Sequence, residues 1–404
     1  MKETFRSLRN RNFRLFFFGQ LISNTGNWLT NVAITLLVLK ITGSGVDVGL
    51  LAAFQYGPIL FLSAWAGAIA DRVDKRKMLF ITQSFEMAQS FGLAIVAFMP
   101  HPPIAALYIL AGFGGIFLSF DNPLRRSFVS EMAPPDDLAN AVVLYSTTMN
   151  VPRILGPALA GLLIVTTGYG WCFAIDAFTY IAVLIALAMM RTEDLHRRAP
   201  KERTKGEIRE GLRYVLGTPL LLINFTILAL IGVMSYNFTV TLPLFVHMSL
   251  GGGDTAFTVL YSIFSAGAVV CTLIVARRNW VKMNHIILGA AALGITMLVL
   301  AATTNIVFAA AAMFLVGMSS ILYMTATTTL VQTESKHEMH GRVLALQLVL
   351  LIGTTPIGGP ISGWLADAFG ARVPIVIGGV VALIAAGWGW LQWKRKPAFV
   401  QNVP

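Results

Sequence analysis

Long apolar runs separated by short polar segments make up almost the whole chain. A helix needs about 20 apolar residues to cross the hydrocarbon core of a bilayer. Twelve runs reach this length, so the pattern predicts an all-α integral membrane protein with twelve transmembrane helices. The predicted spans are residues 13–39, 48–70, 78–99, 104–124, 138–166, 171–190, 219–246, 255–276, 284–303, 305–331, 341–365 and 373–393.

The longest polar stretch lies in the middle of the chain and separates six spans from six. We therefore predict an N-terminal six-helix bundle at 1–190, a cytoplasmic linker at 191–218 and a C-terminal six-helix bundle at 219–404. Apolar residues between 208 and 216 follow helical spacing, which predicts an amphipathic helix on the inner membrane surface. A solvated tether is the alternative for 191–205.

The two halves of the sequence echo each other. The segment Asn31–Leu36 resembles Asn237–Leu242, and Gly156-Pro157 is matched by Gly359-Pro360 at a nearly equal offset. Two such matches indicate a duplicated six-helix unit and hence two pseudo-symmetric bundles. Duplicated halves are typical of secondary transporters, in which the substrate path lies between the repeats.

Composition and charge support the membrane prediction and orient it. Hydrophobic residues make up 56% of the chain and charged residues only 12%, far from the balance of soluble domains. The net charge is +11. If the N-terminus is inside, all but Lys40, Arg153 and Arg372 of the 30 Lys and Arg residues fall in predicted inner segments, as the positive-inside rule requires. We therefore expect a multi-pass membrane protein with both termini in the cytoplasm.

The same charge pattern bears on partners. The basic residues are scattered among loops, where they meet anionic lipid, and form no single groove for a nucleic acid. The two cysteines, Cys172 and Cys271, lie in or at the edge of different spans. We therefore predict no disulfide framework, no metal set and no cofactor.

A stripe of amide side chains runs along the first predicted span. Gln20, Asn24, Asn27 and Asn31 recur every three or four residues, so they share one helix face. Amides facing lipid would cost too much desolvation free energy. We predict that they form a polar wall of a central substrate cavity; hydrogen bonding between helices is the alternative.

Other polar and aromatic residues within the spans are candidates for the same cavity. They combine amide, hydroxyl, aromatic and thioether groups, a surface that adapts to bulky amphipathic ligands. Ordinary packing of the bundle is the alternative for some of them. The candidates are Gln55, Tyr56, Met149, Tyr236, Asn237, Phe264, Tyr323 and Gln347.

The segment from 67 to 77, "GAIADRVDKRK", resembles the signature loop of the major facilitator superfamily. The matching residues are Gly67, Asp71, Arg72, Lys75 and Arg76, whereas Asp74 stands where that superfamily usually has Gly. The resemblance implies that Asp71 caps a helix of the opposite half. It also implies that the basic residues bind an acidic partner and so latch the inner gate.

A second resemblance lies in the fifth predicted span. Gly156, Pro157 and Gly161 resemble the Gly-Pro element of the antiporter branches of this superfamily, where close packing and a bend resist leakage. Nearly the whole chain is similar to a bacterial branch that contains Tap-type multidrug efflux pumps and enterobactin-type siderophore exporters. The resemblance implies a major facilitator fold in the bacterial cytoplasmic (inner) membrane.

Four charged residues lie away from the edges of the predicted spans and are candidates for proton coupling, because charge is costly there. They are Glu86, Asp121, Arg153 and Asp176. The superfamily architecture implies that the first, fourth, seventh and tenth helices line the cavity, which favours Asp121. Asp121 has an alternative role as the acidic partner of basic residues at the inner gate, and the other three have structural alternatives.

These features together predict a secondary active exporter of amphipathic drugs or drug-like metabolites. We expect alternating access with drug:proton antiport by a monomer. The alternative is a siderophore or lipid-like metabolite exporter on the same fold. An integral membrane enzyme is a weaker alternative, because the sequence has no Gly-x-Ser-x-Gly and no Walker motif; we predict that the protein is not an enzyme.

Overall fold

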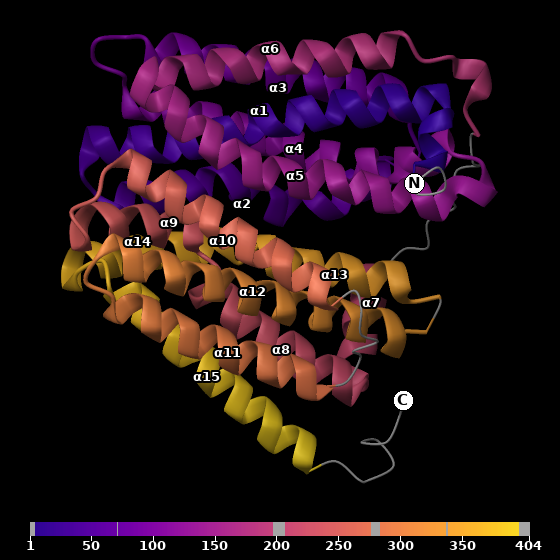
Figure 1. The fold of residues 1–404 in the computed structure, drawn as a ribbon. Helices are drawn as coiled ribbons and strands as arrows, with labels where there is room; N and C mark the ends of the chain where they lie inside the picture. The colour runs from indigo at the N-terminus through magenta and orange to yellow at the C-terminus, as the bar shows by residue number, and fades with distance from the viewer. Residues whose placement is uncertain (1–4, 71, 197–206, 276–282, 337, 396–404) are drawn as a thin grey trace. The chain divides into compact units, whose positions relative to one another are not determined.

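A computed structural model describes residues 5–70, 72–196, 207–275, 283–336 and 338–395. Throughout these ranges the regular secondary structure is helical, and no strand occurs in them (Figure 1). The prediction of an all-α membrane protein is confirmed. Ten of the described helical segments are long and apolar enough to cross a membrane. The helices Arg11–Thr42 and Lys75–Ala97, which match the first and third predicted spans, are more polar.

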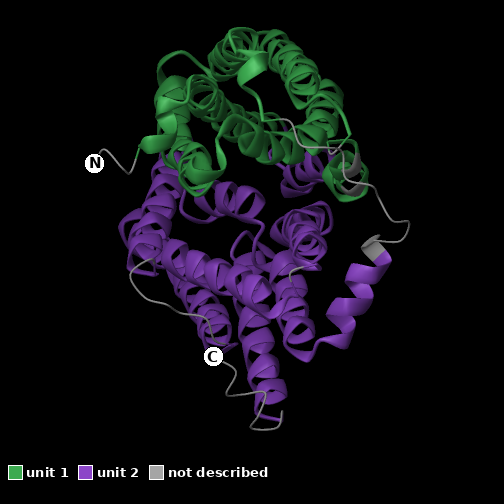
Figure 2. Cartoon of the chain, turned by 90° about the vertical axis from the view of Figure 1, so that its right-hand side faces the viewer, with its two compact units in different colours: residues 1–41, 57–203 green, residues 42–56, 204–404 purple. Residues whose placement is uncertain are grey.

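The chain divides into two compact units (Figure 2). Unit 1 comprises Met1–Ile41 and Gly57–Arg203. It contains α1 (Arg11–Thr42), most of α2 (Gly45–Ala70), α3 (Lys75–Ala97), α4 (Ile104–Met132), α5 (Leu138–Thr166) and α6 (Tyr169–Ala188), with short 3-10 turns at Arg6–Arg9, Pro135–Asp137 and Thr192–Asp194.

Unit 2 comprises Thr42–Tyr56 and Thr204–Pro404, so the first turns of α2 belong to it. The unit boundary therefore lies inside the predicted linker and also crosses α2. The remaining helices of unit 2 are α7 (Glu207–Gly217), α8 (Pro219–Met234), α9 (Phe238–Leu244), the π-helical η4 (Phe245–Ser249), α10 (Asp254–Val275), α11 (Met283–Ala302), α12 (Ile306–Glu334), α13 (His340–Ile352), α14 (Thr355–Phe369) and α15 (Val373–Lys394).

Two predicted spans are interrupted. The seventh consists of α8, α9 and η4, and the eleventh consists of α13 and α14. Pro356 lies in the first turn of α14, where its missing N–H costs nothing. The short turn between the ninth and tenth spans is present as expected, because Asn305 caps α12 by accepting a hydrogen bond from the Phe308 N–H at 3.0 Å.

The two units share a packing pattern. In unit 1, α3 packs on α4 and α6, and in unit 2, α11 packs on α12 and α15. In the order of the predicted spans, the third helix of each unit thus contacts the fourth and the sixth of its own unit. The shared pattern agrees with the sequence echo between the halves.

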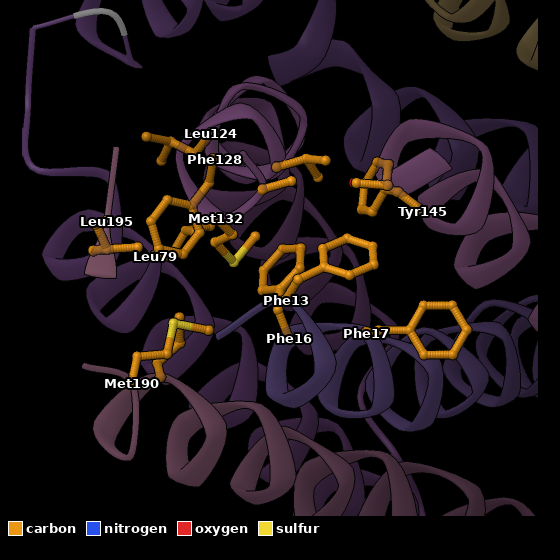
Figure 3. Packing of buried hydrophobic residues seen from close by; sticks show 14 of the residues in the cluster. Phe13, Phe16, Phe17, Leu79, Leu124, Phe128, Met132, Tyr145, Met190 and Leu195 are labelled. Carbon is orange, nitrogen blue, oxygen red and sulfur yellow. The ribbon is translucent and has the colours of Figure 1, made fainter. Parts of the chain in front are cut away.

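An apolar cluster closes one end of unit 1 (Figure 3). Phe16 of α1 meets Phe128 of α4 edge to face, with ring centroids 5.7 Å apart, and stacks on Tyr145 of α5 at 6.1 Å. Leu124 of α4 belongs to the same cluster. The next residue of α4 is Arg125, so a polar site borders this apolar cluster.

Candidate functional site

The polar site of unit 1 is centred on Arg125 of α4, which is 4% exposed. Its Nε donates to the Asp121 carboxylate, and its Nη2 lies 3.8 Å from Glu86 Oε2. Its Nη1 donates to Gln20 Oε1 at 2.9 Å and to Asn24 Oδ1 at 2.6 Å. One guanidinium therefore joins α1, α3 and α4.

Helical spacing assembles this cluster from each side. Asp121 and Arg125 lie four residues apart on α4, and Gln20 and Asn24 lie four apart on α1, so each pair shares a helix face. On α3, Gln83 donates to Asp121 Oδ1 at 2.7 Å and to Glu86 Oε2 at 3.2 Å. Thr82 also donates to Asp121 Oδ1, at 3.0 Å. Three short sequence patterns thus converge on one point.

The charges of this cluster do not balance by themselves. Asp121 is fully buried and Glu86 is 3% exposed, and they share the single guanidinium of Arg125. Burying an uncompensated charge costs several kcal/mol, even after relaxation. Two buried carboxyls thus share one guanidinium, and the neighbouring hydrogen bonds from α1 and α3 are uncharged.

A second buried carboxyl, Asp176 of α6, lies among hydroxyl groups. Its Oδ2 accepts from Thr30 Oγ1 at 2.6 Å and from Ser90 Oγ at 2.7 Å. Thr179 lies farther, at 3.4 Å from Oδ1. Gly26 permits this approach of α1, because a Cβ there would lie 2.5 Å from Asp176 Oδ1. Asp176 therefore ties α1, α3 and α6 together.

The amide stripe of α1 divides between these two regions. Gln20 and Asn24 are buried and bind Arg125, and Asn24 also donates to the Thr148 carbonyl of α5 at 2.9 Å. Asn27 and Asn31 are half-buried and bonded to each other at 2.8 Å. Asn27 also donates to the Tyr180 hydroxyl of α6 at 3.5 Å, so hydrogen bonding between helices engages three of the four amides. A role for the four in substrate binding stays a prediction.

Several candidates for the substrate cavity come together in unit 2. Tyr236 donates to the Ser320 carbonyl of α12 at 2.8 Å, and its ring lies 6.3 Å from that of Tyr323. Phe264 of α10 packs on Phe238, with centroids 5.2 Å apart. These contacts form an aromatic group between α9, α10 and α12.

The remaining cavity candidates make other contacts. Gln347 of α13 donates to Thr328 Oγ1 at 3.0 Å, and Asn237 donates to the Val233 carbonyl at 2.6 Å. Gln55 and Tyr56 are half-buried on the part of α2 that belongs to unit 2. Met149 packs against the apolar cluster of unit 1. Their contact with a substrate stays a prediction.

The basic signature loop has partners within unit 1. Lys75 Nζ lies 2.5 Å from Glu131 Oε1, and Arg76 donates to the Leu187 carbonyl at 2.6 Å. The ion-pair partner of Asp121 is Arg125, and not Lys75 or Arg76. Asp74, which departs from the superfamily pattern, caps α3 by accepting from the Lys77 N–H at 3.1 Å.

The other predicted gating residues are only partly described. Asp71 lies outside the described residues, so its predicted capping role is a proposal only. Gly67 is half-buried and Arg72 is exposed. The gating role of this loop therefore stays a prediction.

The Gly-Pro element of α5 lies within one continuous helix. A Cβ on Gly156 would lie well inside the contact distance of Trp28 Cβ, so glycine permits the close approach of α1. Pro157 and Gly161 are buried, and Arg153 is half-buried. Roles for these four residues in gating or proton coupling stay predictions.

Sequence reasoning missed Arg125. The fourth predicted span ended at residue 124, and Arg125 was counted among inner loop charges, whereas α4 continues to Met132 and buries it. The available signal was its spacing of four residues from Asp121, which is typical of an ion pair on one helix face.

The sequence model of the transmembrane secretion effector family matches residues 2–396. This chain belongs to that family, a branch of the major facilitator superfamily. The match spans both units and every described helix, which confirms the family resemblance found in the sequence.

Three curated relatives each match most of this chain. The multidrug efflux pump Tap of Mycolicibacterium fortuitum is 27% identical over 95% of this chain and 98% of its own. The staphyloferrin A transporter of Staphylococcus aureus is 26% identical over 88% and 90%. The enterobactin exporter EntS of Escherichia coli is 24% identical over 92% and 91%. The relatives are thus transporters of the same superfamily.

Solved structures support the fold. A crystal structure of the peptide transporter POT superposes with a TM-score of 0.79 at 13% identity, covering 96% of this chain and 95% of that one. A bacterial homologue of the human lysosomal transporter Spinster gives a TM-score of 0.71 at 16% identity, over 94% and 97%. The chain is therefore a multi-pass membrane protein with a major facilitator fold.

Proposed function

We propose that this protein is a secondary active exporter of amphipathic small molecules, which works by alternating access and exchanges its cargo for protons. The observation that carries the proposal is the buried cluster of Arg125 with Asp121 and Glu86. Ionisable groups within membrane spans are costly and mark ion pathways. A cluster with one excess carboxyl is suited to carry a proton.

The same guanidinium connects the proton site to the amide stripe. Arg125 divides its donors between two carboxyls and the amides of Gln20 and Asn24. A cargo that binds these amides removes two acceptors from Arg125, so the guanidinium depends more on the carboxylates. This favours their ionised form and releases the proton. Cargo and proton then compete, which antiport requires, and the coupling is reciprocal.

The chemistry of unit 2 supports an amphipathic cargo. The aromatic group around Tyr236, Tyr323 and Phe264 offers broad, non-directional contacts with a few hydroxyls, as promiscuous binders do. Drugs and drug-like metabolites meet this description, and one relative is named a multidrug efflux pump. Siderophores are an equally supported cargo, because two relatives are named for them.

A pH gradient imposed across proteoliposomes tests the proposal, with a fluorescent amphipathic cation as the probe. We expect gradient-driven transport by the parent protein and a fall to the rate of protein-free liposomes in Asp121→Asn. Asp136→Asn is the matched control, since Asp136 is exposed in the turn before α5. Undiminished gradient-driven transport in Asp121→Asn would contradict the proposed proton site.

The same assay separates the alternatives. A channel would pass the probe at a rate independent of the pH gradient, and a membrane enzyme would not move it at all. A drug-susceptibility panel in an efflux-deficient bacterium, with growth under iron limitation measured alongside, distinguishes drug from siderophore cargo. We expect raised resistance to amphipathic drugs when the protein is expressed.

A further inference from the structure

Three buried side chains of unit 2 carry polar atoms that no protein group bonds. Asn224 of α8 and Tyr323 and Thr327 of α12 are each 0% exposed. Among the described residues, no donor or acceptor bonds Asn224 Oδ1, Tyr323 Oη or Thr327 Oγ1. Leaving such an atom unpaired in an apolar interior costs its full desolvation free energy. Folded proteins therefore pair most buried polar atoms, either with protein groups or with ordered water.

The three side chains belong to one part of the unit. Helices α8 and α12 pack on each other (Figure 1), and Asn224 Nδ2 donates to the Thr327 carbonyl at 3.4 Å. Tyr323 and Thr327 lie four residues apart on α12, so their side chains share one helix face. Two neighbouring helices thus bring three buried oxygen atoms with unused hydrogen-bonding capacity to the same region.

The hydroxyl of Thr327 differs from those of other threonines on α12. A threonine within a helix can satisfy its hydroxyl by donating to the carbonyl four residues earlier. Thr329 donates in this way to the Thr325 carbonyl at 2.8 Å, and Thr333 to the Thr329 carbonyl at 3.1 Å. Thr327 makes no such bond. Its hydroxyl is therefore available to a ligand in the buried region.

The chemistry of unit 2 limits what this ligand can be. Every buried polar side chain in the described part of the unit is uncharged, so an ion would lie there without a counter-charge. The Asn224 amide oxygen only accepts hydrogen bonds, whereas the two hydroxyls can donate or accept. The ligand must be neutral, small enough to be enclosed between helices, and able both to donate and to accept. Water meets these conditions.

The sequence repeat relates this region to the ion cluster of unit 1. By the offset between Asn31–Leu36 and its echo in the second half, Thr327 corresponds to Asp121, and Val331 corresponds to Arg125. Val331 is buried like Arg125 but carries no charge. Unit 2 thus keeps a polar side chain at the position of Asp121 and has no guanidinium to bond it.

We propose that Asn224, Tyr323 and Thr327 bind a water molecule between α8 and α12. The water donates to Asn224 Oδ1 and bonds the two hydroxyls, so it pairs all three atoms. A water bridge is nearly as favourable in enthalpy as a direct hydrogen bond, and it reinforces the direct contact of 3.4 Å between the helices. Unit 2 thus joins these helices through a neutral, exchangeable ligand, where unit 1 uses the fixed guanidinium of Arg125.

The substitution Thr327→Val tests the site through the sign of its effect. Valine has nearly the shape of threonine but no hydroxyl, so the water loses a partner. We expect the melting temperature of the detergent-solubilised protein to fall by about 1–2 °C. Removal of a hydroxyl that is buried without any partner would instead raise the melting temperature, because its desolvation cost disappears.

A matched control lies on the same helix. Thr333 is exposed near the end of α12, so Thr333→Val exchanges the same residue types outside the proposed site. We expect it to leave the melting temperature nearly unchanged. A melting temperature of Thr327→Val that equals or exceeds that of the parent protein would overturn the water site.

Infrared spectroscopy identifies the ligand as water. Solvent labelled with heavy oxygen lowers the O–H stretching frequency of a bound water and leaves side-chain hydroxyls unchanged. We expect an isotope-sensitive band in the parent protein and in Thr333→Val that Thr327→Val lacks. Tyr323→Phe, which removes the other hydroxyl, should also shift or lose this band.

The spectra also exclude a direct bond between the two hydroxyls. If Thr327→Val and Tyr323→Phe keep the isotope-sensitive bands of the parent protein, the water site is overturned even when their melting temperatures fall. Neither measurement needs cargo or a pH gradient, so both decide the water site even if the proposed antiport fails.

Discussion

The two units share a helix-packing pattern but differ in the chemistry of their buried polar residues. Unit 1 buries the charged side chains of Arg125, Asp121, Glu86 and Asp176. Among the described residues of unit 2, every buried polar side chain is uncharged. The two units thus share a repeated sequence pattern but differ in whether their buried polar side chains are charged. Among the described residues, the buried charged side chains lie in unit 1, and the buried polar side chains of unit 2 are neutral.

Corresponding helix pairs show the difference at the level of single contacts. Between α1 and α4, the guanidinium of Arg125 binds Gln20 and Asn24. Between α8 and α12, the corresponding helices of unit 2, Asn224 donates to the Thr327 carbonyl at 3.4 Å. Loss of one partner from a buried neutral hydrogen bond costs about 1–3 kcal/mol, whereas loss of one partner from a buried ion pair leaves an uncompensated charge and costs about 3–5 kcal/mol.

The largest effect is expected from Arg125→Leu. Removing the guanidinium leaves Asp121 and Glu86 without their cation. Loss of one partner from a buried ion pair lowers the free energy of unfolding by about 3–5 kcal/mol. Thermal unfolding of the detergent-solubilised protein measures the loss. Arg126→Leu is the control, because the neighbouring Arg126 is exposed. Equal melting temperatures for the two variants would show that Arg125 is not the centre of the cluster.

A smaller effect is expected from Asp176→Asn. The amide retains one acceptor oxygen for the Thr30 and Ser90 hydroxyls but leaves part of the site poorly paired, so we expect a loss of about 1–2 kcal/mol. Gradient-driven transport in proteoliposomes should persist, because Arg125 and its carboxyls are untouched. Loss of proton coupling in this variant would show that the proton site also includes Asp176 of α6.

The smallest effect is expected in unit 2. Asn224→Ala removes one interhelical hydrogen bond of 3.4 Å, and such bonds in membrane proteins contribute about 0.6 kcal/mol on average. The melting temperature should fall only slightly, and the response to the pH gradient should not change. A fall in melting temperature as large as that of Arg125→Leu would contradict the difference between the two units.

Much of the fold could be predicted from the sequence, because the bilayer imposes a simple length and polarity rule on every span. The interruptions near Ser235 and Gly353 could not, because helix breaks inside an apolar run do not alter its hydropathy. Asp121 and the amides of α1 were recognised as costly residues that need partners. The partner itself, Arg125, was assigned to a loop.

Sequence alone determined that this chain spans the membrane and which polar side chains cannot face lipid, since both follow from local composition and helical spacing. Tertiary structure decided which of those side chains meet, because the contacts of Arg125 and Asp176 join residues far apart in the chain. The free energy of a buried charge depends on the groups within a few ångströms of it, and only the folded helices place them there.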